Sequence, residues 1–117
     1  MAFWKRQAET PQAPITVITP NVEQAVLVRI NSLSDPDSGL DLIEDPIIEA
    51  IDRAGVGEFD GNEIGPDGAT LYMYGPDAEA LWAAIESVVR QSPLGPGSYA
   101  IKRYGPPGAP ETRVDLV

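Results

Sequence analysis

Two alternating segments joined by a four-residue turn constrain the fold of this chain more than any other feature. Residues 69–74 (ATLYMY) alternate along their length with the period of a strand, and residues 57–64 (GEFDGNEI) show a weaker strand pattern. The turn between them, residues 65–68 (GPDG), has proline at its second position and glycine at its fourth. This combination predicts an antiparallel hairpin.

On each side of the hairpin the apolar period changes to that of a helix. Asp45 is a favourable N-cap and Pro46 suits the first helical position, so we expect the first helix to begin there and to end at Gly55. The residues before it, 32–41 (SLSDPDSGLD), are rich in turn formers and predict a loop. A second helix is expected from about Pro76 to Gln91. Its apolar stripe consists of Ala78, Leu81, Trp82, Ile85, Val88 and Val89.

Two further strands complete the pattern, at residues 24–30 (QAVLVRI) and at residues 98–104 (SYAIKRY). The order strand, helix, strand, strand, helix, strand predicts an α+β protein. Specifically, it predicts a ferredoxin-like βαββαβ sandwich, an antiparallel sheet with two helices on one face. We expect residues 21–117 to form this single domain, with residues 112–117 as an additional edge strand.

Residues 1–20 contain three prolines and predict an N-terminal arm in which residues 15–18 (ITVI) suggest an edge strand. The first residues include charges but no apolar run, so they do not resemble a signal peptide. No window approaches the ~18 consecutive apolar residues of a membrane span. The sequence predicts a cytoplasmic protein that contacts no membrane.

The chain contains neither cysteine nor histidine. Cysteine would be needed for a disulfide or a thiolate metal site, and histidine is the commonest acid–base group near neutral pH and the commonest metal ligand. Only carboxylate chemistry, or a hard cation held by oxygens, remains readily accessible to this sequence.

Two acidic segments resemble calcium loops only in part. In residues 35–46, Gly39 and Pro46 stand where a ligand acid and a bidentate glutamate are needed, and in residues 60–71 apolar side chains occupy those places. Acidic turn residues explain both segments, so we expect no metal site and no cofactor.

Glu58, Asp60 and Glu63 raise the alternative of a carboxylate enzyme. A charged, glycine-broken edge strand, which prevents sheets from pairing edge to edge, explains them better, since a chain this small offers little cleft. No nucleophile-elbow or nucleotide-binding motif occurs. We therefore expect no enzymatic activity.

Acidic residues are concentrated in the middle of the chain. The net charge is −10, and from Asp35 to Glu86 there are fourteen acids and one base, Arg53. Such a field repels nucleic acid and anionic membranes and favours a basic protein partner. The alternative is that the acids only keep the protein in solution. The expected binding surface comprises Asp35, Asp37, Asp41, Glu44, Glu58, Asp60 and Glu63.

A second candidate surface follows from the alternation of side chains along strands. If the most apolar positions of each strand face the helices, with Ile101 facing inward on the last strand, then rings and cations remain for the open face of the sheet. These residues are Arg29, Tyr72, Tyr74, Lys102 and Tyr104. Rings among cations are typical of RNA-stacking sheets, but the signature runs of the RRM are missing and the net charge opposes phosphates. A protein partner, or self-association as a homodimer through this face, fits the composition better.

The segments GEFDGNEIGPDGATLYMYGPDAEALW and GSYAIKRYGPPG, in the C-terminal half of the chain, resemble small uncharacterised bacterial ferredoxin-like domains. The shared elements are the DG-containing hairpin, the strand ending in YGPDA and the closing RYGPPG. They are largely structural, and no catalytic residue is carried over. The chain is more loosely similar to acidic bacterial immunity proteins in its size, acidity and lack of Cys and His. That resemblance implies neutralisation of a toxin by binding, without chemistry.

The sequence thus predicts a non-catalytic protein-binding or regulatory module whose acidic surface binds a basic protein. The alternative is a self-associating or small-ligand-binding domain that uses the open sheet face.

Overall fold

The computed structural model describes residues 23–31, 36–65 and 68–117, and of residues 36–39 the backbone alone. The expected N-terminal arm, including its strand at 15–18, and the turn residues 66–67 lie outside the described residues. Along the chain the elements are β1 (Gln24–Asn31), α1 (Pro36–Ala54), β2 (Glu58–Gly65), β3 (Gly68–Gly75), α2 (Ala78–Arg90), β4 (Tyr99–Arg103) and β5 (Glu111–Asp115).

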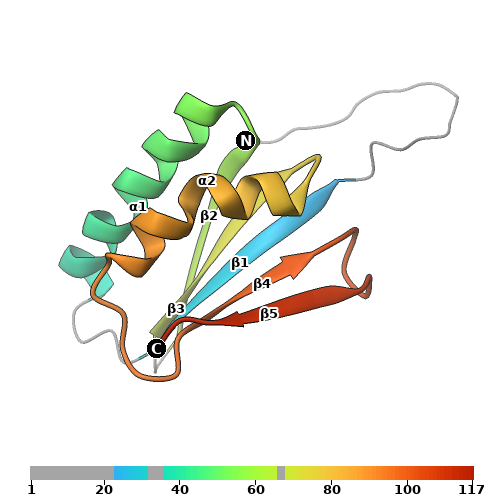
Figure 1. The fold of residues 1–117 in the computed structure, drawn as a ribbon. Coiled ribbons are helices and arrows are strands. Elements are labelled where there is room, and N and C mark those ends of the chain that lie inside the picture. Colours follow the sequence, from blue (N-terminus) through green and yellow to red (C-terminus); the bar gives the residue numbers. More distant parts are fainter. Residues whose placement is uncertain (1–22, 32–35, 66–67) are drawn as a thin grey trace, which may run out of the picture.

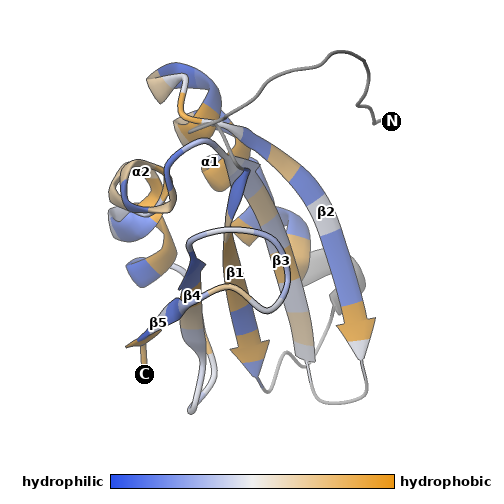
Figure 2. Ribbon diagram, turned by 90° about the vertical axis from the view of Figure 1, so that its right-hand side faces the viewer, coloured by the Kyte–Doolittle hydropathy of each residue, from blue (hydrophilic) through white to orange (hydrophobic). Residues whose placement is uncertain are grey.

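The five strands form one antiparallel sheet in the order β2-β3-β1-β4-β5. Both helices lie on the same side of this sheet, which leaves its other side, here called the open face, without a helix (Figure 1, Figure 2). The α+β class and the antiparallel sheet with two helices are therefore confirmed. The strand order and the number of helices are compatible with the expected ferredoxin-like sandwich.

The hairpin predicted from the sequence is formed by β2 and β3, with Gly65 paired to Gly68 at its closed end. The register shifts by one residue between Phe59 and Gly61, so a β-bulge interrupts the edge strand β2. At the opposite edge of the sheet β5 pairs with β4, close to where an edge strand was expected. Acidic and glycine-interrupted sequence thus borders the sheet, and the β-branched strand β1 lies at its centre.

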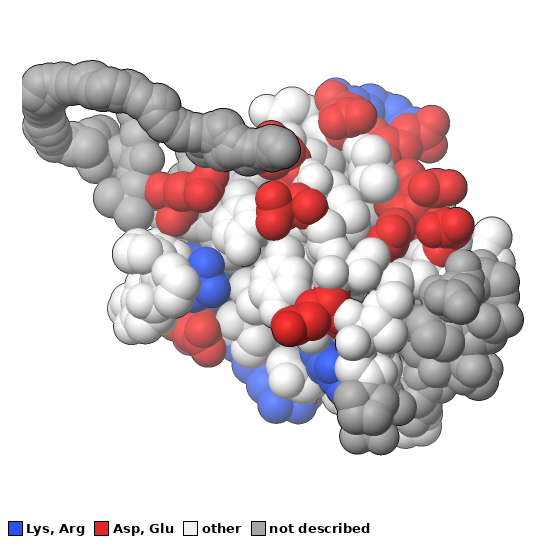
Figure 3. All heavy atoms as spheres, turned by 180° about the vertical axis from the view of Figure 1, so that it is seen from behind, with Lys and Arg blue, Asp and Glu red and all other residues white. Residues whose placement is uncertain are grey.

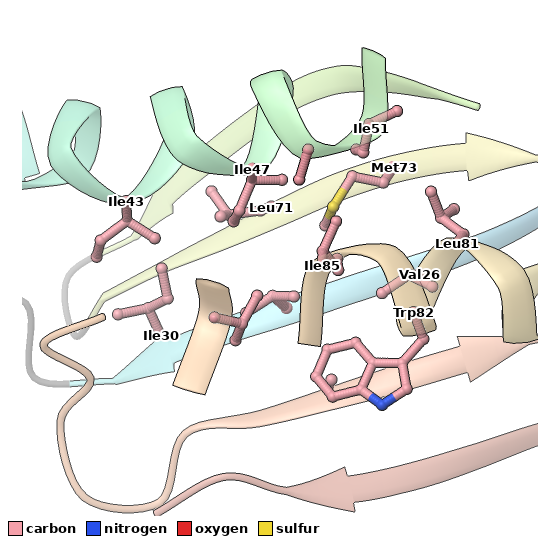
Figure 4. Packing of buried hydrophobic residues seen from close by; sticks show 14 of the residues in the cluster. Val26, Ile30, Ile43, Ile47, Ile51, Leu71, Met73, Leu81, Trp82 and Ile85 are labelled. Atoms are coloured by element: carbon pink, nitrogen blue, oxygen red, sulfur yellow. The ribbon is translucent and has the colours of Figure 1, made fainter. Parts of the chain in front are cut away.

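The core lies between the helices and the sheet, and isoleucine and leucine side chains fill most of it (Figure 4). Alternate residues of the two central strands point into it, since Val26, Val28 and Ile30 of β1 and Leu71 and Met73 of β3 are fully buried. From the helices come Leu40, Ile43, Ile47, Ile51, Leu81, Trp82, Ile85 and Val89.

Helix α2 begins where its capping sequence predicts. The Asp77 carboxylate Oδ1 accepts hydrogen bonds from the backbone N–H groups of Glu79 (2.9 Å) and Ala80 (3.3 Å). These bonds satisfy two of the donors that the first turn of a helix leaves unpaired. The predicted stripe is buried at Leu81, Trp82 and Ile85, and Val88 is half-buried beside it.

Helix α1 begins at Pro36, well before the predicted start at Asp45 and Pro46, so the loop expected over residues 32–41 is wrong for residues 36–41. Buried Leu40 and Ile43 extend the apolar stripe toward the N-terminus, and their burial outweighs the capping signal. Pro46 is tolerated inside the helix because it is exposed, so the carbonyl it leaves without a partner can be hydrated. At its other end α1 closes as expected at Gly55, which has φ +66° and donates its N–H to the Ile51 carbonyl at 2.9 Å.

Candidate binding surfaces

The outer side of α1 combines acidic side chains with an exposed leucine and a groove. The groove, about 250 Å³ in volume, lies between α1 and the C-terminal end of α2. Leu42 on its rim is 72% exposed, so most of its apolar surface is open to solvent. The lining residues are Leu42, Pro46, Val88, Gln91, Ser92 and Pro93. An apolar side chain from another molecule can bury surface here.

The exposed charges of α1 are mainly acids, and of these Asp41 and Asp45 adjoin the groove residues Leu42 and Pro46. Asp41, Asp45, Glu49 and Asp52 are all exposed, and the one base is Arg53. Among the described residues the only ion pair on α1 joins Arg53 Nη2 to Glu49 Oε1 at 3.4 Å. Repulsion between acids three or four residues apart costs a helix a few tenths of a kcal/mol, and a cationic partner would relieve it.

The acids chosen from the sequence do not form one surface. Asp41 lies on the exposed side of α1, whereas Glu58, Asp60 and Glu63 lie exposed on β2 at the edge of the sheet. Glu44 is buried and therefore does not belong to an exposed acidic surface. Asp35 lies outside the described residues, and Asp37 falls in α1, where its side chain is not described. Figure 3, seen from the side opposite to Figure 1, shows acidic side chains gathered along one flank of the molecule.

Glu44 is only 9% exposed because the early start of α1 turns this position toward β2. The Asn62 amide Nδ2 donates a hydrogen bond of 2.6 Å to Glu44 Oε2 and so joins helix to edge strand. Burial raises the pKa of the Glu44 carboxyl above its ordinary value; the bond from Asn62 opposes this, and the charges of Asp41 and Asp45 add to it. Glu44 is therefore a structural side chain, which corrects its assignment to the binding surface.

This geometry predicts a pH-dependent difference between the protein and its Glu44→Gln variant. The pKa of Glu44 is higher in the folded state than in the unfolded state, so protonation of this carboxyl stabilises the folded protein. This stabilising contribution is complete at pH values below the unfolded-state pKa. The contribution is lost as the pH rises through the folded-state pKa. We expect the free energy of unfolding by urea, protein minus variant, to be larger at about pH 4 than at about pH 7. The same difference at both pH values would contradict the burial argument.

The open face carries rings, cations and apolar side chains from four strands. Leu27 and Arg29 of β1 and Tyr72 and Tyr74 of β3 alternate with core residues and are half-buried. The Tyr72 hydroxyl donates to Glu63 Oε1 on β2 at 2.9 Å. This bond raises the pKa of Tyr72, with smaller contributions from burial and from the Glu63 charge. The middle of the face has few charges, as Figure 3 shows.

Lys102 and Tyr104 do not lie on this face, which corrects their assignment. Lys102 pairs with core-facing Val26, and its Nζ lies 3.0 Å from Glu79 Oε2 of α2. The Tyr104 hydroxyl donates to the same Glu79 oxygen at 2.5 Å. Side chains directly opposite each other in a sheet share a face, so both residues belong to the helix side. The hydrogen bonds from Tyr104 and Lys102 lower the pKa of Glu79.

The error on β4 comes from its small core residue. Ala100, not Ile101, is fully buried and shares the core cluster with Trp82, whereas Ile101 pairs with Leu27 on the open face. A single-residue change of parity transfers every side chain of a strand to the other face. The bulk of Ile101 therefore favoured the wrong face, since the closely packed core on the helix side of β4 is filled at this position by the small side chain of Ala100.

The corrected parity adds residues that the sequence argument missed. Tyr99 and Arg103 of β4 lie on the open face, and Arg113 of β5 lies with its guanidinium 3.8 Å from the centre of the Tyr99 ring. Arg103 and Tyr74 lie together at one end of the face. There a hollow of about 320 Å³ is lined by Glu23, Tyr74, Arg103, Pro106 and Pro107. The alternation SYAIKR would have identified Tyr99 and Arg103 had Ala100 been assigned to the core.

Among the described residues, no group of three or more carboxylates lies close enough together to hold a metal ion. No described helix is long and apolar enough to cross a membrane. Comparison with family models, with curated proteins and with solved structures found no match to this chain. Function is therefore argued from the two surfaces themselves.

Proposed function

We propose that the protein is a non-catalytic binding module for a basic protein partner, which docks on the outer side of α1. The observation that carries the proposal is the groove beside Leu42, an apolar site bordered by exposed acids. A partner segment with lysines or arginines around an apolar side chain matches both properties. Binding without chemistry is also the mode of action that the resemblance to immunity proteins implies.

The apolar and charged parts of this surface contribute differently. Burial of an apolar side chain in the groove supplies affinity, at about 25 cal/mol per Å² removed from water. Asp41, Asp45 and Glu49 attract the partner at long range and raise the association rate more than they add affinity. The proposal therefore predicts both salt dependence and a specific dependence on Leu42.

We also propose that the domain is ferredoxin-like. Support comes from the strand order, since β4-β1-β3-β2 is the order expected for a βαββαβ sandwich, with β5 added beside β4. Both helices connect strands that lie in this sheet and cover its same face.

A synthetic amphipathic helical peptide of lysine and leucine tests the proposed function, with an oligolysine of equal charge as the charge-only probe. By calorimetry, we expect Leu42→Ser to weaken binding of the Lys-Leu peptide about tenfold, corresponding to ~1.4 kcal/mol of lost burial, and to leave oligolysine binding unchanged. Both affinities should fall as salt increases.

Two charge reversals provide the matched control. Asp45→Lys beside the groove and Glu111→Lys on β5 change the net charge equally, but only the first removes an acid from the proposed site. We expect Asp45→Lys to weaken binding of the Lys-Leu peptide several-fold more. Equal weakening by both variants, or no binding of the peptide at low salt, would overturn the proposal.

A further inference from the structure

We propose that the open face of the sheet is the interface of a homodimer, in which the faces of two copies stack about a two-fold axis parallel to the strands. No helix of the described residues covers this face. Yet it carries a continuous set of half-buried apolar and aromatic side chains. These are Leu27, Tyr72, Tyr74, Tyr99 and Ile101. Uncovered patches of this kind mark interaction sites on soluble proteins.

The charges of this face differ from those of the whole chain. Three of the chain's eight basic residues, Arg29, Arg103 and Arg113, lie here, so cations make up a larger share of the charges than in the whole chain. The acids of the face lie on the two outer strands, at Glu58 and Glu63 of β2 and at Glu111 and Asp115 of β5. Tyrosine and arginine are the residues most enriched where interfaces gain their binding energy. The 3.8 Å stacking of Arg113 on Tyr99 shows that these groups already associate within one copy.

A two-fold interface requires one patch to complement itself. The open face meets this requirement because it presents cations and rings together, so that each copy can offer an arginine to a tyrosine of the other. Leu27 and Ile101 supply the apolar centre for both copies. A mainly acidic surface, such as the outer side of α1, repels its own copy and is less suited to pairing in this way.

The acids on the outer strands β2 and β5 indicate over which strands of the sheet the two-fold axis lies. If the axis ran through β1, β2 of one copy would stack over β5 of the second copy. The cross-strand register would then oppose Glu58 to Glu111 of the second copy, and Glu63 to Asp115 of the second copy. Like charges in such positions are destabilising. An aligned stack with this axis is therefore disfavoured.

An axis between β1 and β4 removes this conflict. It stacks β1 over β4 of the second copy and β3 over β5 of the second copy, while β2 and its acids remain outside. By the register, Leu27 then faces Ile101 of the second copy, and Arg29 faces Tyr99 of the second copy. Tyr72 likewise faces Arg113 of the second copy. This offset is the arrangement we propose.

Cysteine pairing tests the arrangement directly, because the chain contains no cysteine of its own. Leu27 and Ile101 also oppose each other within one chain, so the two cysteines must be placed on separate chains. After air oxidation of an equimolar mixture of the Leu27→Cys and Ile101→Cys proteins, we expect a disulfide-linked heterodimer, identified by mass. The matched control mixes Leu27→Cys with Leu42→Cys, whose cysteine lies on exposed α1. We expect at least a fivefold lower yield from the control.

Sedimentation equilibrium tests the dimer without modification. The protein should sediment as a monomer–dimer mixture, and Leu27→Lys should weaken dimerisation at least about tenfold, whereas Leu42→Lys should not change it. Binding of the Lys-Leu peptide should survive Leu27→Lys, since that site lies on α1, so the two proposals can fail separately. A strict monomer at millimolar concentration, whatever else covers the face, would overturn the dimer. So would a dimer in which Leu27→Lys has no effect, or equal disulfide yields from the two mixtures.

Discussion

Replacing Gly68 with alanine is expected to reduce the free energy of unfolding by about 3 kcal/mol or more, the largest effect of any single methyl group that we predict. A Cβ built on Gly68 would lie 1.9 Å from the carbonyl oxygen of Ile30. Real Cβ atoms do not approach a backbone oxygen this closely, and the oxygen belongs to the central strand β1. The strands would have to separate where Asn31 pairs with Gly68. Urea unfolding followed by circular dichroism measures the loss.

Gly65 provides the matched control for this substitution. It pairs with Gly68 across the same hairpin, but a Cβ built there meets no atom of the described residues within 4 Å. We expect Gly65→Ala to change the free energy of unfolding by no more than about 0.5 kcal/mol, since the added methyl group has open space among the described residues and lies on the edge strand. Equal losses for the two alanines would show that the hairpin requires glycine for flexibility, and would contradict the close approach of β3 to β1.

The strands and helix α2 could be predicted from sequence because each is determined by a local pattern without a competing signal. The segment ATLYMY alternates along its whole length. In α2, which ends at Arg90, the apolar residues recur every three or four positions. In both cases the burial pattern follows the period, so local preference and tertiary packing agree. The edge strand β2 was also recognisable, although its bulge at Phe59 was not.

The face that each β4 side chain occupies and the start of α1 could not be predicted from local patterns. In each case the outcome depends on which of several nearby residues packs into the core. On β4, bulk favoured Ile101 for the core, but the space near Trp82 accommodates Ala100. On α1, the pair Asp45-Pro46 has the chemistry of a helix start, yet the helix passes through it. In both cases long-range packing decides against a valid local preference. Surfaces inferred from such positions inherit the error, as Lys102 and Glu44 did.

The same competition on α1 leads to a second large prediction. Replacing Ile43 with alanine is expected to reduce the free energy of unfolding by about 2–5 kcal/mol, the usual range when a buried isoleucine is truncated. Ile43 is fully buried and lies in the segment of α1 before Asp45 that the capping signal would have excluded from the helix. If burial of Ile43 stabilises the helical conformation of the residues before Asp45, the alanine variant should lose part of this first segment of the helix. Urea unfolding measures the loss, and far-ultraviolet circular dichroism of the folded variant measures any loss of helix.

Leu42 makes the comparison informative because it directly precedes Ile43 on the same helix and is 72% exposed. We expect Leu42→Ala to change the free energy of unfolding by less than about 0.5 kcal/mol, since helix propensity is nearly equal for the two residues and little surface is buried. Comparable losses at both positions would mean that residues 36–44 are helical by local preference and not by packing. A stable Leu42→Ala protein that binds the Lys-Leu peptide more weakly would show that this leucine serves the groove and not the fold.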